Sequence, residues 1–450
     1  MKIDSDLRLT WDWLAAPDVR APEIRATWAR LSIFAGAECV TLVEDKESGS
    51  SRRSIFTSLY PLAEWIAFNW WFLRADTRPA TALSRLPARY DALWSGYGER
   101  YRVRHGFRGI GDGFLWPDLF LLPEGETVRI VWSADGAVDD SRLVRFLTRG
   151  NLSVDGAALT HRLASFVESV VDRIAEQGVG QTPLATEWAN IQTADSEETE
   201  YCLAAARLGL DPYSDALKYS DDIVRSAEQL TDPSLLRDFL DVVDPDKIAA
   251  TLRWVSAAKD EIEALTSRPS GEVAELRSAA RPLPGWNGMR PWELGWAQAR
   301  LIRGALHLDQ DHAFEVERLV TEVTRPTSSL GLHALGEAKE GSYPLLVVSH
   351  RQPGVSKRFV LARALWHVLW QDSSTFLVTS AHTDRQKTER AFAAEVLAPA
   401  QGISSRIVDD GVHSGLEDSA LDELARHFRV STLLVQHQIE NQLLPAWRTA

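Results

Sequence analysis

The order of elements in the last third of the sequence constrains the fold more than any other feature. Residues 292–303 have apolar side chains at helical spacing, and residues 343–349 have the pattern of a short buried strand. Residues 357–370 follow as a largely apolar segment of helical length, and residues 391–399 continue another helix. This succession predicts a mostly helical domain with a small sheet, over residues 288–450.

The sequence ahead of that domain predicts two more. Residues 1–178 combine strand-like segments, at 39–43 and 128–132, with an apolar helix over 58–73, which indicates a tryptophan-rich α+β module. Residues 185–280 are rich in acidic side chains at helical spacing, and this predicts a helical domain with a solvated charged face. We therefore expect a multidomain α+β protein.

Two further segments of the first module carry their own structural predictions. Residues 106–118 contain several glycines but lack the Lys with Ser or Thr that a phosphate-binding loop requires, so a turn followed by a strand is predicted. Residues 151–178 have apolar side chains at helical spacing, which predicts a helix that closes the module.

Net charge and cysteine content limit the classes of partner and the compartment. The formal charge of -14 does not indicate general nucleic-acid binding, although it leaves room for a local basic patch. The only cysteines, Cys39 and Cys202, cannot form a disulfide framework and suit a reducing cytoplasm. No run of about 18 apolar residues occurs, so neither membrane spanning nor export is expected.

The C-terminal elements carry a family resemblance. Arg358-Phe359 and Ala362 follow the buried strand, and the next five residues are Arg363-Ala364-Leu365-Trp366-His367. This order, over roughly residues 291–445, resembles the ImmA/IrrE family of zinc metallopeptidases. The resemblance implies a zincin-like helix with a His-Glu-x-x-His motif, whose histidines bind zinc and whose glutamate activates water.

The residues that perform this chemistry are mostly replaced. Arg363 stands at the first histidine, and a guanidinium that stays protonated does not bind zinc. Ala364 stands at the general base, where a methyl group cannot accept a proton. Only His367 remains, so no catalytic residue and no metal or other cofactor is expected.

The family's third ligand is an acidic residue on the next helix. The window for it holds Gln386–Thr388, which includes no carboxylate. Glu389 lies one position outside this window, and Glu395 is expected to be structural. The degenerate site thus comprises Arg363, His367, Glu389 and Glu395, and Arg363 is expected either to pair with one of the two glutamates or to face solvent.

The leading hypothesis is a catalytically inactive, pseudopeptidase-like protein that acts through protein contacts as a regulatory, sensing or scaffold component. Members of the family that it resembles are prokaryotic cytoplasmic proteins that cleave or respond to repressors in mobile elements, stress responses and phage defence. The resemblance therefore implies a role of this kind and a protein partner.

Two alternatives stay open. In the first, the chain is a zinc endopeptidase that cleaves a repressor-type protein, with His367 joined by His382, Asp384 or Glu389 as relocated ligands. In the second, the chain is a DNA-binding regulator, because residues 424–439 have the pattern of a helix-turn-helix. The second helix of that pattern contains no Lys or Arg, which weakens this reading.

Overall fold

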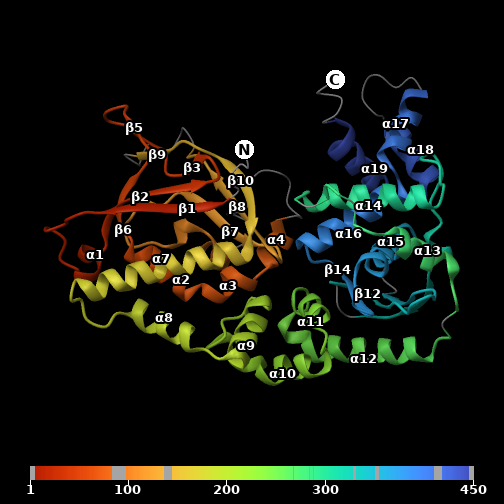
Figure 1. Ribbon diagram of the computed structural model, residues 1–450, viewed down its shortest axis with the longest axis horizontal. Coiled ribbons are helices and arrows are strands. Elements are labelled where there is room, and N and C mark those ends of the chain that lie inside the picture. The colour runs from red at the N-terminus through yellow and green to blue at the C-terminus, as the bar shows by residue number, and fades with distance from the viewer. Residues whose placement is uncertain are drawn as a thin grey trace. The chain divides into compact units, whose positions relative to one another are not determined.

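The computed structural model describes residues 6–83, 98–135, 144–266, 268–282, 284–286, 288–327, 331–349, 354–409 and 418–444. These residues form two compact units, Met1–Tyr219 and Ser220–Ala450, whose elements are labelled in Figure 1. The division falls inside residues 185–280, the range expected for a helical middle domain. Both units combine helices with small sheets, which confirms the predicted α+β class.

Unit 1 contains small antiparallel sheets. One has the order β1-β2-β3 with β6 also paired to β2, one has the order β10-β8-β7, and one has the order β5-β4-β9. The strands are β1 (Leu7–Trp13), β2 (Trp28–Ala35), β3 (Glu38–Cys39), β4 (Val43–Asp45), β5 (Ser51–Arg52), β6 (Ile55–Ser58), β7 (Asp118–Pro123), β8 (Thr127–Ser133), β9 (Val144–Phe146) and β10 (Gly150–Asp155).

Helices complete the core of unit 1. They are α1 (Pro22–Ala26), α2 (Tyr60–Phe68), α3 (Trp70–Ala75), α4 (Arg78–Leu83), α6 (Gly98–His105), α7 (Gly156–Glu176), α8 (Pro183–Thr193) and α9 (Ser196–Arg207). Many of the tryptophans are buried in this core; Trp70 packs edge-on against Trp188, with ring centroids 5.0 Å apart. Aromatic area therefore supplies much of the core, in keeping with its large apolar surface.

The local predictions for unit 1 were partly right. The strand at 128–132 lies in β8, and residues 106–118 do form turns that lead into β7. The predicted helix at 58–73 is divided into α2 and α3 at Asn69, whose side chain donates to Trp65 O (2.8 Å). A turn likewise interrupts the strand predicted at 39–43.

The predicted helix at 151–178 was wrong at its start. Its first residues belong to β10, which pairs with β8, and α7 begins only at Gly156. Asp155 accounts for the switch, because its carboxylate accepts a hydrogen bond from Ala158 N (2.7 Å) and caps the helix. Pairing with β8 is a long-range interaction that helical spacing does not report.

Unit 2 is built on one four-stranded sheet with the order β11-β13-β12-β14. Its strands are β11 (Thr321–Arg325), β12 (Leu332–Glu337), β13 (Leu345–Ser349) and β14 (Thr375–Thr379). The first two in this order are parallel, and the remaining pairs are antiparallel. Among the described residues, β14 is therefore an edge strand.

The helices of unit 2 lie on both faces of this sheet. They are α10 (Ser220–Gln229), α11 (Pro233–Leu240), α12 (Ile248–Ala264), α13 (Gly271–Ala279), α14 (Pro291–Ala305), α15 (Gly354–Trp370), α16 (Asp384–Leu397), α17 (Ala400–Asp409), α18 (Asp418–Phe428) and α19 (Thr432–Gln438), which continues as a π-helix at Ile439–Leu443. Figure 1 shows α12 on one side of β12 and β14, and α15 and α16 on the other.

Alternation along the strands explains this layering. Phe376 and Val378 of β14 belong to the same hydrophobic core as α15 and α16. Leu377 is just as buried but points to the opposite side, because successive strand side chains alternate. There α12 packs against β12 and β13. Helix α11 contacts β14.

Among the described residues, we find no helix that combines the length and the apolar character needed to cross a membrane.

Candidate functional site

Helix α15 places three site residues in the interior. Arg363, Ala364 and His367 are exposed by 2%, 1% and 0% of their surface. The helix is apolar on nearly all sides, so it is enclosed by the sheet and by neighbouring helices. Residues 363 and 367 are four apart and therefore lie on one face of the helix.

Helix α16 brings Glu389 to this face. The position of α16 is set by its close approach to α14. Gly295 of α14 permits this approach, because a Cβ on it would lie 2.3 Å from Thr388 O of α16. Its N-terminus is a capping box, in which the side-chain oxygen of Gln386 accepts from Thr383 N (3.2 Å). Glu389 is consequently fully buried and directed at α15.

Arg363 connects three elements. Its Nε donates to Glu389 Oε1 (2.9 Å), and its Nη2 forms an ion pair with the same oxygen. The Nη2 atom also donates to Thr379 O at the end of β14 (2.6 Å), which in addition accepts from Arg390 Nη2 (3.2 Å). Of the two glutamates considered from the sequence, Glu389 and Glu395, Arg363 thus pairs with Glu389.

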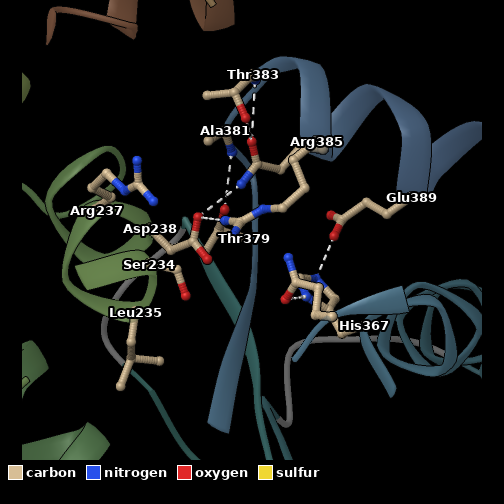
Figure 2. Close-up of polar contacts among 12 residues, drawn as sticks. Ser234, Leu235, Arg237, Asp238, His367, Thr379, Ala381, Thr383, Arg385 and Glu389 are labelled. Carbon is tan, nitrogen blue, oxygen red and sulfur yellow. Dashed lines mark hydrogen bonds and ion pairs between the residues drawn. The ribbon is translucent and has the colours of Figure 1, made fainter. Parts of the chain in front are cut away.

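His367 completes what we call the Arg363 cluster: Arg363, His367 and Glu389. Its Nε2 forms an ion pair with Glu389 Oε2, drawn in Figure 2, without hydrogen-bond geometry. Its Nδ1 donates to Gln371 Oε1 (2.6 Å), and its ring stacks on Phe376 at a centroid distance of 4.7 Å. Both ring nitrogens are therefore engaged by side chains.

The charges of the cluster compensate one another. Burial disfavours the ionised form of Glu389, but the positive charges of Arg363 and His367 outweigh it and lower its pKa to about 2. A carboxylate this acidic remains ionised at neutral pH. The carboxylate is shared between a guanidinium and an imidazole, and Arg363 takes up its Oε1 atom.

These residues do not fit a zinc ion of the kind that the family resemblance implies. Such an ion takes three or four protein ligands, and the cluster offers only His367 and Glu389. Within the part of the chain that the structure describes, no group of three His, Cys, Asp or Glu side chains is placed to hold a metal. His382 and Asp384 therefore do not complete a ligand set with His367 there.

Glu395 lies in a different set of contacts. Its carboxylate accepts from Arg300 Nε (2.9 Å), Gln438 Nε2 (2.8 Å) and Gln442 Nε2 (2.7 Å), as well as from Ala400 N (3.2 Å). These bonds join α14, α16 and the C-terminal helices. Glu395 thus links helices of unit 2 and makes no hydrogen bond or ion pair with Arg363 or His367, both of which lie in the described part of the chain.

Two participants were not found by sequence reasoning. Gln371 lies four residues after His367, so helical spacing could have identified it as a neighbour. Thr379 O could not have been found in this way, because a backbone carbonyl leaves no signal in the sequence. Its role depends on how β14 ends beside α15.

The residues with the expected helix-turn-helix pattern, 424–439, lie in α18, a turn, α19 and the start of the π-helix. Arg429 adopts a positive φ of 57° in the turn, and the Ser431 hydroxyl caps α19 by accepting from Leu434 N (3.3 Å). Leu433, Gln436 and His437 are exposed on the second helix. Over its described residues, that helix presents no Lys or Arg for phosphate contacts.

Comparison with known proteins agrees with the resemblance in one region. Residues 324–440 match the model of peptidase family M78, described as the IrrE N-terminal-like domain. No curated protein matches the chain. The matched region begins in β11 and includes the sheet, α15, α16 and the two C-terminal helices. We conclude that residues 324–440 are an IrrE N-terminal-like domain of the ImmA/IrrE metallopeptidase family.

Proposed function

We propose that this domain no longer hydrolyses peptides and acts through protein contacts instead. The observation that carries the proposal is the buried ion pair between Arg363 and Glu389. Arg363 brings a fixed positive charge to the place of a metal ligand, and it occupies an oxygen of the carboxylate that a metal would need.

The missing general base supports the same conclusion. Ala364 is buried and offers only a methyl group where the motif requires a glutamate. A metal-bound water at this position would have no group on α15 to accept its proton. Loss of the base and loss of a ligand are independent changes, and each one removes a step of hydrolysis.

The family match and the length of the chain support a regulatory role. The family resemblance implies proteins that cleave or respond to repressors, and this chain has more than 300 residues ahead of the matched region. We propose a cytoplasmic regulatory, sensing or scaffold component with a protein partner, in phage defence or in the regulation of mobile elements or stress. The net charge of -14 does not favour a nucleic-acid partner.

Metal content tests the loss of activity directly. Purified protein freed of chelator is analysed by elemental mass spectrometry, as wild type, as His367→Ala and as the double variant Arg363→His/Ala364→Glu. Wild type is expected to hold no stoichiometric zinc, whereas the double variant regains a His-Glu-x-x-His motif and is expected to bind it. Zinc in wild type that His367→Ala removes would overturn the proposal.

One observation favours the alternative of a zinc endopeptidase. His367 and Glu389 face each other, and both are side chains that can bind zinc. A fluorogenic peptide library incubated with zinc-loaded wild type separates the two functions. Cleavage that is lost on His367→Ala would support the endopeptidase, and absence of cleavage is expected under our proposal.

A further inference from the structure

Strand β1 lies at the edge of its sheet in unit 1 (Figure 1). It pairs antiparallel with β2 along its whole length, from Leu7 opposite Ala35 to Trp13 opposite Ala29. Strands β3 and β6 pair with the other side of β2, so no described strand pairs with the outer side of β1. The outer backbone groups of an edge strand are a template for pairing with another extended chain.

A bond just beyond β1 fixes which of its residues face outward. Leu14 N donates to Trp28 O (2.9 Å), so these two residues form a pair that is bonded through the main chain. Such bonding alternates along an antiparallel pair, and the even-numbered residues of β1 are therefore bonded to β2. The odd-numbered residues point their N–H and C=O groups away from β2. The backbone groups of Leu9 and Trp11 have no hydrogen-bond partner among the described residues.

Burial decides how much of this outer edge is accessible. Leu7 is 0% exposed, which closes the first residue of β1. Leu9 and Trp11 are only partly buried, and the Trp11 ring packs edge-on against Phe166 of the core, with ring centroids 5.3 Å apart. Thr10, on the opposite face, is exposed. The accessible edge therefore begins after Leu7, with an apolar face toward the core and a polar face toward solvent.

The sequence of this edge is self-complementary about Thr10. When two β1 strands pair antiparallel about that residue, Thr10 lies opposite Thr10 of the second copy, and Arg8 lies opposite Asp12 on each side of the centre. Leu9 then lies opposite Trp11, and both have outward-pointing backbone groups. These pairs exchange main-chain hydrogen bonds, and the threonines and charged residues occupy the closely spaced positions between them.

The charges of β1 favour this register over its neighbours. Arg8 lies over the Phe34 ring, 5.3 Å from its centroid, and no described carboxylate forms an ion pair with it. Asp12 is paired with Arg30, but 65% of its side chain remains exposed and can accept Arg8 of a second copy. A shift by two residues keeps the main-chain bonding but loses both ion pairs, and in one direction it opposes Asp6 to Asp12.

We propose that β1 is a self-association edge, through which two copies of this chain pair antiparallel about a two-fold axis at Thr10. The contact is isologous, since the same strand serves both copies. A contact this small is expected to be reversible, with dimers at about 50 µM and mostly monomers at about 1 µM. The interface lies in unit 1, so it neither requires nor tests the loss of peptide hydrolysis.

Cross-linking tests the position of the two-fold axis. Thr10→Cys places two thiols in a closely spaced antiparallel pair, where the Cα atoms are about 4.5 Å apart and within reach of a disulfide. Ser32→Cys is the matched control. Ser32 lies beside Thr10 on β2, so its two copies would be about 14 Å apart, or three strand spacings.

Both cysteine variants are treated with oxidised glutathione at the dimer-forming concentration and run on a non-reducing gel. The native thiols, Cys39 and Cys202, are buried. We expect a covalent dimer from Thr10→Cys and monomer from Ser32→Cys. Equal amounts of dimer from both variants, or dimer from neither, would overturn the proposal.

Single charge reversals test the register. Arg8→Asp and Asp12→Arg each oppose like charges in a self-paired dimer, so each alone is expected to associate at least about tenfold more weakly than wild type in sedimentation velocity. An equimolar mixture of the two variants opposes unlike charges again and is expected to recover dimers. Monomeric wild type at about 50 µM, unchanged single variants, or a mixture that stays monomeric each contradict the proposal.

Asp12→Arg also places a cation beside Arg30, so circular dichroism first checks that this variant folds. If it does not fold, Arg8→Asp and the two cysteine variants decide the outcome. These substitutions are on the exposed face of the sheet or beside it and leave the apolar side chains of β1 unchanged.

Discussion

Each unit of the molecule contains a buried histidine beside a buried carboxylate. In unit 1, His105 Nε2 faces Asp76 Oδ2 at 3.2 Å, and both side chains are fully buried. In unit 2, His367 Nε2 forms an ion pair with Glu389 Oε2, and both side chains are again fully buried. The surroundings of the two pairs differ. In unit 1, His105 Nδ1 donates to Leu121 O (3.0 Å), and Asp76 also accepts from Arg78 N (3.1 Å). In unit 2, Glu389 is shared with the guanidinium of Arg363.

A buried histidine–carboxylate pair is therefore not by itself a catalytic site. The unit 1 pair is completed by backbone groups and resembles an ordinary structural polar contact. The unit 2 pair joins α15 to α16 within the residues that match the IrrE N-terminal-like domain, and an arginine side chain completes it. The two sites differ in the groups that complete the pair: backbone atoms in unit 1 and the Arg363 side chain in unit 2.

The largest expected effect is on the Arg363 cluster. Glu389→Ala leaves a guanidinium and an imidazole buried without their carboxylate, so we expect a loss of roughly 3–5 kcal/mol in the free energy of unfolding. Urea denaturation followed by tryptophan fluorescence measures it. Glu315→Ala, which removes an exposed partner of Arg318, is the control and should change stability little.

Acid should weaken the same cluster. The folded-state pKa of Glu389 is about 2, below its ordinary value of 4.5, so the carboxylate stabilises the fold above pH 4.5 and that contribution is lost as pH falls toward 2. Thermal unfolding between pH 5 and pH 2 is expected to show a flatter decline for Glu389→Gln than for wild type. Asp232, whose pKa is also lowered to about 2, contributes to the decline in both proteins.

A smaller effect is expected for the histidine pair of unit 1. Asp76→Asn keeps the side-chain shape and the bond from Arg78 N but removes the charge that faces His105, so we expect a loss of about 1–3 kcal/mol. Chemical denaturation measures it. A loss as large as that of Glu389→Ala would show that the backbone groups around His105 do not compensate for the charge, and the contrast between the sites would then disappear.

The smallest effect is expected at an exposed ion pair. Arg30 and Asp12 lie opposite each other on β2 and β1, 2.7 Å apart, with 54% and 65% of their side chains exposed. Asp12→Ala should change the free energy of unfolding by less than about 1 kcal/mol, because water already solvates both charges. Salt titration of the unfolding curve checks whether any residual effect is electrostatic.

Much of unit 2 could be predicted from local patterns. The buried strand at 343–349 and the helices at 292–303, 357–370 and 391–399 all lie within or largely overlap β13, α14, α15 and α16. Long apolar segments predict their own secondary structure because period and length suffice. The helix predicted for residues 151–155 was wrong, because pairing with β8 overrode the helical spacing.

The sequence by itself determined that Arg363, Ala364 and His367 stand where the family resemblance implies a His-Glu-x-x-His motif, because these residues have a fixed spacing on one helix. Only the tertiary structure decided that Arg363 pairs with Glu389 rather than with Glu395. That choice depends on the rotation of α16, which Gly295 sets by allowing α14 to approach Thr388. The attachment of α11 to Ser373 and to α16 was likewise decided by contacts between residues 141 or more positions apart, which no local pattern encodes.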